Sequence, residues 1–470
     1  MHYHLIGICG TAMGSLAGML QAKGHKVTGS DQNVYPPMST QLEKLGIKIF
    51  EGYRAENINV GADCIIVGNA ISRGNPELEE VLNRKLLYRS QAEVVKEEFI
   101  RGKKSLVVAG THGKTTTTSL AAWVCEVGGL NPSFLIGGVA QNFDSSFRVS
   151  NSDYFIIEGD EYDTAYFDKK PKFMHYLPEV AIVNNIELDH ADIYRDLHEI
   201  KYQFSRLMNL VPGNGRLICG VDSEAVREVL SEMHGKLYTV VETFGIDHDA
   251  NWRARYIEFV DGKTRFAVFK DDHFFGEFQM SLIGEFNVRN ALAVIAAASF
   301  WGISKEKIQQ AFNTFKSVKR RMEIRGVECG VTVIDDFAHH PTSVEETLKA
   351  LRLRFHENRL IAVFEPRTWS SRLAVFQQQY AKAFTYADYV VIAGVYNIAK
   401  ASELGKILDV DELVEDIKLQ GKPAFSYPDA DTIVEKLTPE LKRGDVVVIM
   451  SNGGFGSIHE KLLERLKDKC

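Results

Sequence analysis

A short glycine-rich segment between a predicted strand and a predicted helix constrains this chain most strongly. The apolar run Ser105–Ala109 predicts a strand, and residues 117–127 predict a helix. Between them stand Gly110, Thr111, His112, Gly113, Lys114, Thr115 and Thr116. Glycines in such a turn let backbone N–H groups point at an anion, and the following helix N-terminus favours negative charge. The segment therefore predicts a phosphate-binding loop in an α/β domain.

Two side chains of this loop have the chemistry that a nucleoside triphosphate requires. Lys114 would bring a positive charge to the β- and γ-phosphates, and Thr115 would help to hold a magnesium ion. The loop is two residues shorter than the usual G-x-x-x-x-G-K-[ST] pattern, so an ordinary strand-to-helix turn is the alternative interpretation. The strand before the loop and the helix after it favour the nucleotide.

A second predicted strand, Tyr154–Glu158, ends on an acidic residue, and further acids follow in residues 160–163. A triphosphate loop needs an acid for its metal ion, usually at the end of a neighbouring strand. Glu158 meets that requirement. The alternative is that these acids form a solvated turn.

A third predicted strand, Val180–Asn184, leads to Asp189 and His190. A histidine in this position is either a metal ligand or general base, or else a hydrogen-bonded structural residue. Because the carboxyl ends of parallel strands meet at one edge of a sheet, we expect the three strand ends to converge on one crevice. That convergence favours a functional role for His190.

Strand and helix patterns alternate along most of the 470 residues, which predicts α/β layers with parallel sheets. Lysine-rich breaks divide the chain into three expected domains, residues 1–103, 104–318 and 319–470. We expect Rossmann-like first and third domains and a central P-loop mononucleotide-binding domain. Between residues 215 and 285 the hydrophobic period changes to two, with a turn signal at residues 261–262, which predicts an antiparallel β insert.

Another glycine turn lies near the start of the chain, after an apolar strand that we place at His4–Ile8. Its glycines, Gly7, Gly10 and Gly14, do not have the G-x-G-x-x-G spacing of a dinucleotide site. A NAD-dependent dehydrogenase, with Asp31 as the acid for the ribose, is therefore a remote alternative. A glycine turn before a helix still suits a diphosphate.

Charge and hydropathy patterns limit the classes of partner. The formal net charge of −7 argues against nucleic-acid binding, which depends on clustered Lys and Arg. No run of 18 or more apolar residues occurs, and the first residues lack the charged start and apolar core of a signal peptide. We therefore expect a cytoplasmic protein with neither a nucleic-acid nor a membrane partner.

Taken in order, the motifs of this chain resemble those of the Mur ligase family over essentially its whole length. The resemblance rests on residues 110–116, 158–163, 189–190, 284–291, 320–323 and 335–342. It implies an ATP-dependent ligase that uses Mg²⁺ and forms an amide bond. It also implies that the three domains bind a UDP-sugar, ATP and a peptide, in that order.

Within the family, residues 7–14, 158–163 and 450–459 are most similar to one branch. That branch joins UDP-N-acetylmuramate to the murein tripeptide L-alanyl-γ-D-glutamyl-meso-diaminopimelate in cell-wall peptide recycling. The alternative is the branch that adds L-alanine to UDP-N-acetylmuramate, which usually has Ser where Tyr162 stands. A non-catalytic nucleotide switch is a remote alternative. We expect a monomer or a weak dimer.

The resemblance also implies individual site residues. ATP would contact Gly110, Thr111, His112, Gly113, Lys114, Thr115, Thr116, Asn287, Asn290, Arg321 and Asp336. The UDP-sugar would contact Gly10, Thr11, Ala12, Met13, Asp31, Asn69 and Ser72. The peptide would contact His339, His340, Arg367 and Arg372. The metal ligands would be Thr115, Glu158 and His190, and the catalytic residues Lys114, His190 and Arg321.

Several of these assignments have structural alternatives. In the alternative for Asn287 and Asn290, Asn287 would cap a helix and Asn290 would be exposed. The arginines at 320–321 would form a solvated hinge. The arginines at 367 and 372 would be solvated residues at the start of a helix. Residues 75–77 are expected on the uridine side of the UDP-sugar, or else as a plain loop. The family's carbamoylated lysine, some fifteen residues after the histidine, has no counterpart here, since Ser205 stands at that spacing.

Overall fold

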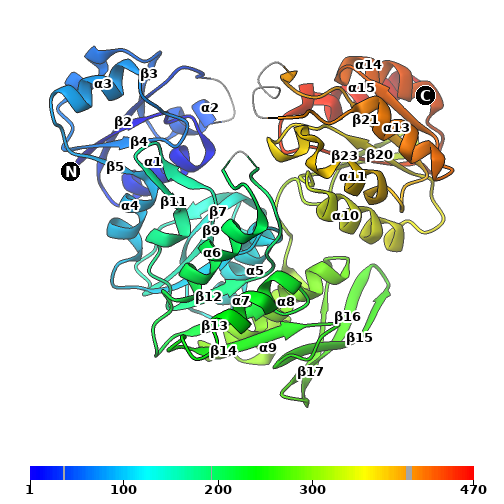
Figure 1. Ribbon diagram of the computed structural model, residues 1–470, viewed down its shortest axis with the longest axis horizontal. Coiled ribbons are helices and arrows are strands. Elements are labelled where there is room, and N and C mark those ends of the chain that lie inside the picture. Colours follow the sequence, from blue (N-terminus) through cyan, green and yellow to red (C-terminus); the bar gives the residue numbers. More distant parts are fainter. Residues whose placement is uncertain (35–37, 192, 399–404, 470) are drawn as a thin grey trace.

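Three α/β units, each built on its own sheet, make up the computed structural model, which describes residues 1–34, 38–191, 193–398 and 405–469 (Figure 1). The sheets have five, ten and six strands, and a separate two-stranded ribbon pairs β10 with β11. The predicted fold class, three α/β layers with parallel sheets, is confirmed. No helix within the described ranges is both long and apolar enough to cross a membrane.

The first unit is a parallel sheet in the order β3-β2-β1-β4-β5. Strand β1 is entirely buried and ends at Ile6, two residues earlier than predicted, because Gly7 turns the chain with φ +83°. Its elements are β1 His2–Ile6, α1 Thr11–Ala22, β2 Lys26–Asp31, α2 Met38–Lys44, β3 Lys48–Glu51, a 3-10 helix Ala55–Val60, β4 Cys64–Val67, α3 Pro76–Asn83, β5 Tyr88–Ser90, α4 Gln91–Val95 and a π-helix Lys96–Ile100.

Residues 75–77 stabilise this unit. The prediction that Glu77 contacts the uridine of a UDP-sugar is wrong. The side chain of Asn75 caps α3 by accepting a hydrogen bond from the backbone N–H of Glu77 at 3.0 Å. Glu77 is fully buried and accepts hydrogen bonds from the hydroxyl of Ser30 and, at 2.5 Å, from the side chain of Asn57. A carboxylate enclosed in this way holds β2 against α3.

The central unit contains ten strands in the order β17-β16-β15-β14-β13-β12-β6-β9-β7-β8. Strands β12, β6 and β9 are parallel neighbours, so their carboxyl ends lie side by side as predicted. The elements are β6 Lys104–Ala109, α5 Lys114–Val127, β7 Ser133–Ala140, β8 Ser145–Arg148, β9 Tyr154–Gly159, β10 Asp163–Ala165, β11 Asp168–Pro171, β12 Val180–Val183, α6 Leu197–Met208, β13 Arg216–Gly220, α7 Glu224–Glu232, β14 Val240–Gly245, β15 Trp252–Val260, β16 Lys263–Lys270, β17 His273–Met280, α8 Glu285–Phe300 and α9 Lys305–Thr314.

The antiparallel insert is present but smaller than predicted. Strands β13 and β14 remain parallel to the core, and within the predicted insert only β15, β16 and β17 pair antiparallel. The predicted hairpin turn is confirmed, because Asp261 and Gly262 both have positive φ between β15 and β16. Strands β13 and β14 are so short that their hydrophobic pattern does not distinguish parallel core strands from antiparallel insert strands.

The first and central units contact each other through α1 and β8. A Cβ atom added at Gly18 would lie 2.4 Å from Cζ of Phe147, so a larger residue in α1 would force that ring to move. The hydroxyls of Ser15 and Ser146 are hydrogen-bonded at 2.9 Å. This contact fixes the first glycine turn relative to the phosphate loop.

The third unit is a six-stranded sheet in the order β18-β19-β23-β20-β21-β22. All its neighbouring pairs are parallel except β18 with β19, a hairpin that was not predicted. The elements are β18 Glu323–Glu328, β19 Val331–Asp336, α10 Pro341–Arg354, β20 Leu360–Phe364, α11 Gln377–Ala383, β21 Tyr389–Ala393, α13 Val410–Leu419, β22 Ala424–Tyr427, α14 Ala430–Leu437, β23 Val446–Met450 and α15 Ile458–Lys469.

The buried carboxylate of α3 gives a stability prediction. Glu77→Ala leaves the donors of Ser30 and Asn57 without a partner, so we expect a loss of about 2–4 kcal/mol in unfolding free energy. Equilibrium urea unfolding followed by circular dichroism measures it. The control Glu79→Ala removes an exposed ion pair on the same helix and should change stability much less. Equal losses in the two variants would contradict the enclosed role of Glu77.

Candidate active site

The phosphate loop joins β6 to α5 at the centre of the ten-stranded sheet. Gly110 and Gly113 have φ of +138° and +81°, conformations that favour glycine. A Cβ atom at Gly113 would lie 2.6 Å from Oδ1 of Asn290 and 3.0 Å from Nδ2 of Asn184. The loop therefore needs glycine both for its backbone path and for the close approach of these two amides. Helix α5 begins directly at Lys114.

Lys114 lies folded against the loop and paired with an acid from the end of β9. Its Nζ donates to the carbonyl of Gly110 at 2.7 Å and to both carboxylate oxygens of Glu161 at 2.9 and 2.8 Å. Burial alone would lower the pKa of Lys114, but the charges of Glu161, Asp160 and Glu158 outweigh it and raise the pKa. The lysine is therefore a fixed positive charge beside the loop.

The predicted metal ligands Thr115 and Glu158 are in contact. The hydroxyl of Thr115 donates to Glu158 Oε1 at 2.9 Å, and the backbone N–H of Gly137 donates to Oε2 at 2.8 Å. Burial and the neighbouring Asp160 raise the pKa of Glu158. A cation between the hydroxyl and the carboxylate would favour the ionised acid. This oxygen pair suits Mg²⁺, which prefers hard oxygen ligands.

Arg321 reaches the same place from the third unit. Its Nη2 donates to the hydroxyl of Thr115 at 3.3 Å, and its guanidinium lies 5.0 Å from the centre of the Phe337 ring. The adjacent Arg320 donates to the carbonyls of Ser451 and Gly453 at 2.7 and 2.8 Å. The alternative of a solvated double-arginine hinge is wrong, because both side chains have fixed partners.

His190 stands opposite Lys114 across Glu161. Its Nε2 lies 3.3 Å from Oε1 of Glu161, and its backbone N–H donates to Asp189 Oδ1 at 2.7 Å. Burial alone would lower the pKa of His190, but the hydrogen bond to Glu161 and the charge of Asp189 raise it to about 9. Glu161 thus connects two residues that sequence reasoning placed in the site separately.

Both asparagines of α8 are buried, so the alternative in which Asn287 caps the helix and Asn290 is exposed is wrong. The helix cap is Gly284, and the side chain of Asn287 donates to the carbonyl of Ile283 at 2.8 Å. Asn290 lies against Gly113 of the phosphate loop. Of the two, Asn290 is the one in contact with the phosphate loop.

Asp336 ends β19 and is held by the chain around it. Its carboxylate accepts hydrogen bonds from the backbone N–H groups of Met322 at 2.7 Å and Ala338 at 2.8 Å. Burial raises its pKa, although Arg321 partly offsets the effect. In this arrangement Asp336 positions the segment that carries Arg321.

A cavity of about 280 Å³ lies between the central and third units. Its lining includes three of the predicted residues, His339, Arg367 and Arg372, next to His190. Arg372 is only 5% exposed and its guanidinium lies 3.9 Å from the centre of the Trp369 ring, so the solvated alternative is wrong for it. The full lining is Asp189, His190, His339, Arg367, Thr368, Trp369, Ser370, Arg372, Tyr396 and Asn452.

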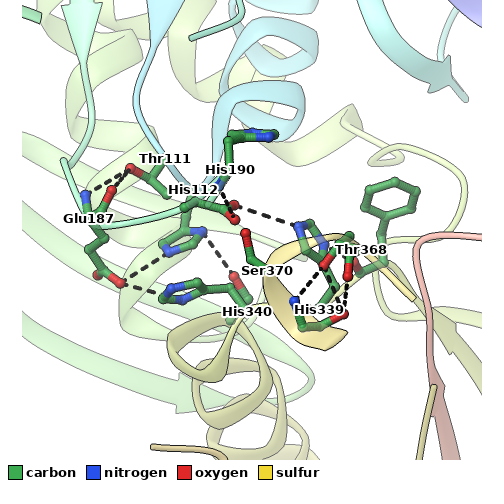
Figure 2. A network of polar contacts seen from close by, with 12 residues as sticks. Thr111, His112, Glu187, His190, His339, His340, Thr368 and Ser370 are labelled. Atoms are coloured by element: carbon green, nitrogen blue, oxygen red, sulfur yellow. Dashed lines mark hydrogen bonds and ion pairs between the residues drawn. The ribbon is translucent and has the colours of Figure 1, made fainter. Parts of the chain in front are cut away.

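His340, predicted to bind the peptide beside His339, instead faces the phosphate loop (Figure 2). Its Nδ1 lies 3.5 Å from Oε2 of Glu187, and the Nε2 of His112 lies 3.2 Å from the same oxygen. Glu187 also fixes the loop, because its backbone N–H donates to the hydroxyl of Thr111 at 2.8 Å. The third unit is thereby connected to the phosphate loop through one carboxylate.

The first glycine turn brings its predicted residues to the carboxyl ends of β1, β2 and β4. Asp31 supports the turn, since its carboxylate accepts from the backbone N–H groups of Cys9 at 2.8 Å and Asn33 at 3.0 Å. Asn69 and Ser72 are exposed in the adjacent loop. The remaining members, Gly10, Thr11, Ala12 and Met13, form the start of α1.

Two residues that connect the site were not assigned a role from the sequence. Glu161 and Glu187 lie within the polar runs that follow β9 and β12, so proximity to Glu158 and His190 was the available signal. Their partners come from distant segments and are visible only in the fold.

Ser205 stands at the spacing of the family's carbamoylated lysine. It lies on α6 and donates to the carbonyl of Tyr202 at 2.7 Å, so its hydroxyl is hydrogen-bonded within its own helix.

The Glu161–His190 contact gives a pH prediction. Glu161→Gln removes one of the two carboxylate charges that favour the protonated imidazole and leaves Asp189 in place, so the pKa of His190 should fall clearly below about 9. An NMR titration of the His190 ring nitrogens measures the change. The control Glu199→Gln lies on α6 outside this contact and should leave the value in place. A His190 pKa still near 9 in Glu161→Gln would refute the coupling.

Comparison with known protein families accounts for nearly all of the chain. Residues 2–101 match the Mur ligase family catalytic domain, residues 108–298 the Mur ligase middle domain, and residues 320–453 the Mur ligase glutamate ligase domain. The three matches follow the order of the three sheets.

Individual relatives are similar over their full length. UDP-N-acetylmuramate--L-alanyl-gamma-D-glutamyl-meso-2,6-diaminoheptandioate ligase of Escherichia coli (strain K12) is 41% identical, covering 100% of this chain and 99% of the relative. UDP-N-acetylmuramate--L-alanine ligase of Caldanaerobacter subterraneus is 33% identical, covering 99% of this chain and 97% of the relative. The crystal structure of a murein peptide ligase from Psychrobacter arcticus 273-4 has a TM-score of 0.75 at 36% identity, covering 100% of this chain and 99% of that one. The chain belongs to the Mur ligase family.

Proposed function

We propose that this protein is an ATP-dependent ligase that joins the lactyl carboxylate of UDP-N-acetylmuramate to the amino group of L-alanyl-γ-D-glutamyl-meso-diaminopimelate. The observation that carries the proposal is the convergence of Lys114, Glu158 and His190 beside a cavity that contains two arginines. The name of the relative that is 41% identical over the full chain supports the same pair of substrates.

Each unit would then hold one substrate. Residues 1–103 bind the UDP-sugar at the first glycine turn, residues 104–318 bind ATP at the phosphate loop, and residues 319–470 bind the tripeptide. ATP and a UDP-linked precursor are compatible with a cytoplasmic enzyme. Because the substrates bind to three units, the units must close on one another for reaction.

The side chains at the loop fit a magnesium nucleotide. Thr115 and Glu158 would offer oxygen ligands for one ion, and His190 with Glu161 would hold a second. When bound, Mg²⁺ neutralises phosphate charge during transfer. Lys114 would move from Glu161 to the β- and γ-phosphates, and Arg321 would add a second positive charge from the third unit.

The chemistry requires activation of the acid, since a carboxylate does not condense with an amine in water. A lactyl carboxylate oxygen attacks the γ-phosphorus, ADP leaves, and an acyl phosphate forms. The peptide amine then attacks the acyl carbon, the bond from carbon to the phosphate oxygen breaks, and the nitrogen loses a proton. The protein contributes positioning and charge stabilisation, through Lys114 and Arg321 above all.

The tripeptide would occupy the cavity between the central and third units. It carries several carboxylates, and Arg367 and Arg372 offer planar donor groups that pair with carboxylates in bidentate fashion. His339 lies beside them, at 3.8 Å from Oδ2 of Asp189. The position of this cavity next to His190 would bring the amine close to the activated acid.

Replacement of the loop lysine tests the nucleotide site. Lys114→Ala should lower kcat/KM for ATP-dependent ligation by about 10²–10³, equivalent to about 3–4 kcal/mol, because it removes a charge that stabilises the transferring phosphoryl group. Circular dichroism should show an intact fold. The matched control Lys461→Ala, a surface lysine of α15, should be fully active. Near-normal turnover in Lys114→Ala would reject the assignment.

Competition between amine substrates tests the acceptor. We expect the protein, given UDP-N-acetylmuramate and Mg-ATP, to form the UDP-linked tripeptide product and to release phosphate only when both the sugar acid and the tripeptide are present. Mass spectrometry with equal L-alanine and tripeptide identifies the product. Preferential addition of L-alanine would place the protein with the alanine-adding ligases instead. ATP hydrolysis at the same rate with and without the two co-substrates would contradict ligation altogether.

A further inference from the structure

Three potential metal-binding side chains meet between the phosphate loop and the third unit. His112 comes from the loop, Glu187 from the segment after β12, and His340 from the residue that precedes α10 (Figure 2). Their ligand atoms all lie within 4.8 Å of one another. In Figure 2 both imidazole rings face the Glu187 carboxylate. This trio lies apart from the Thr115–Glu158 pair assigned to the nucleotide.

The spacings from the two histidines to the carboxylate match those around a tetrahedral ion. Zinc bonds of about 2.0–2.1 Å place neighbouring ligand atoms about 3.3 Å apart. Here Nε2 of His112 lies 3.2 Å, and Nδ1 of His340 lies 3.5 Å, from the same Oε2 of Glu187. Two histidines and one carboxylate, with a fourth position left for water, form a known ligand set for zinc.

The outer ring nitrogens already have the partners that orient metal-binding histidines. Nε2 of His340 lies 3.1 Å from the carbonyl of Leu188, which only accepts, so Nε2 carries the proton. Nδ1 of His112 lies 3.1 Å from the hydroxyl of Ser343. Such contacts fix the tautomer and aim the other nitrogen at an ion.

The proton on Nε2 leaves Nδ1 of His340 as a lone pair facing an anion. That nitrogen lies 3.5 Å from Oε2 of Glu187, and a cation bound between the two atoms would be attracted to both.

We propose that His112, Glu187 and His340 bind one divalent ion of the zinc class, such as Zn²⁺ or Co²⁺. The mixed nitrogen and oxygen ligands favour these ions over Mg²⁺ and Ca²⁺. The bound ion ties the start of α10 to the phosphate loop and so holds the third unit against the central one. This site is additional to the proposed ligase reaction and does not depend on it.

A purely hydrogen-bonded contact is the competing explanation. The backbone N–H of Thr342 donates weakly to Nδ1 of His340 at 3.4 Å, and the hydroxyl of Thr342 donates to Glu187 Oε2 at 2.7 Å. Such a contact needs no ion and gives no selectivity among metals. The two explanations therefore differ in a direct metal-binding measurement.

Cobalt spectroscopy on tag-free, chelator-treated full-length protein tests the site. Co²⁺ is added in the presence of excess Mg²⁺, which occupies the oxygen-rich nucleotide site, and visible absorption reports tetrahedral coordination. His340→Asn removes the ring but keeps a side chain that caps α10, and Glu187→Gln keeps the shape while removing the charge. Ser343→Ala removes only the partner of His112. His356→Asn, an exposed histidine that also has a glutamate neighbour, is the matched control.

We expect one equivalent of tetrahedral Co²⁺, displaced by Zn²⁺, in the wild type and in His356→Asn. Affinity should fall about 10- to 100-fold in Ser343→Ala, and the tetrahedral band should be lost in His340→Asn and Glu187→Gln. His190→Asn should retain the band. Absence of a tetrahedral band in the wild type, or a band that survives His340→Asn but is lost in His190→Asn, would overturn the proposal. Circular dichroism and thermal unfolding verify that each variant is folded.

Discussion

The parallel pairing of β9, β6 and β12 is the constraint on which the rest of the site depends. Ala109, the last residue of β6, is in register with Gly159 on one side and Val183 on the other. This register brings the phosphate loop and the acidic segment after β9 to one edge, together with the polar segment after β12. Lys114 and His190 therefore meet the same carboxylate, Glu161, although nothing in their sequence spacing requires it.

Contacts from the third unit complete the site without sharing its sheet. Arg321 reaches Thr115 from one side, and His340 reaches Glu187 from the other. Both contacts end on the phosphate loop or on a residue that holds it. The third unit therefore contributes side chains to the surroundings of the loop. Residues of both units line the cavity that contains Arg367 and Arg372.

Local patterns predicted the parts of the molecule that local chemistry determines. The phosphate loop, the three converging strands and the hairpin at residues 261–262 depend on neighbouring residues, and all are present. Glu77 was misassigned because its burial depends on how α3 packs against β2. The roles of Glu161 and Glu187 were not predicted, because each depends on partners distant in sequence. The strand β18 was not predicted, because it lies at the edge of its sheet and is largely exposed, so its sequence has no buried apolar run.

The central claim is that the phosphate loop transfers the γ-phosphoryl group of ATP to a carboxylic acid. The most direct test uses UDP-N-acetylmuramate labelled with ¹⁸O in both oxygens of its lactyl carboxylate. When ATP and the tripeptide are added, the account predicts that the released phosphate carries one ¹⁸O atom, because the acyl carbon gives up that oxygen when the amide forms. Unlabelled phosphate released together with ligated product would contradict the account.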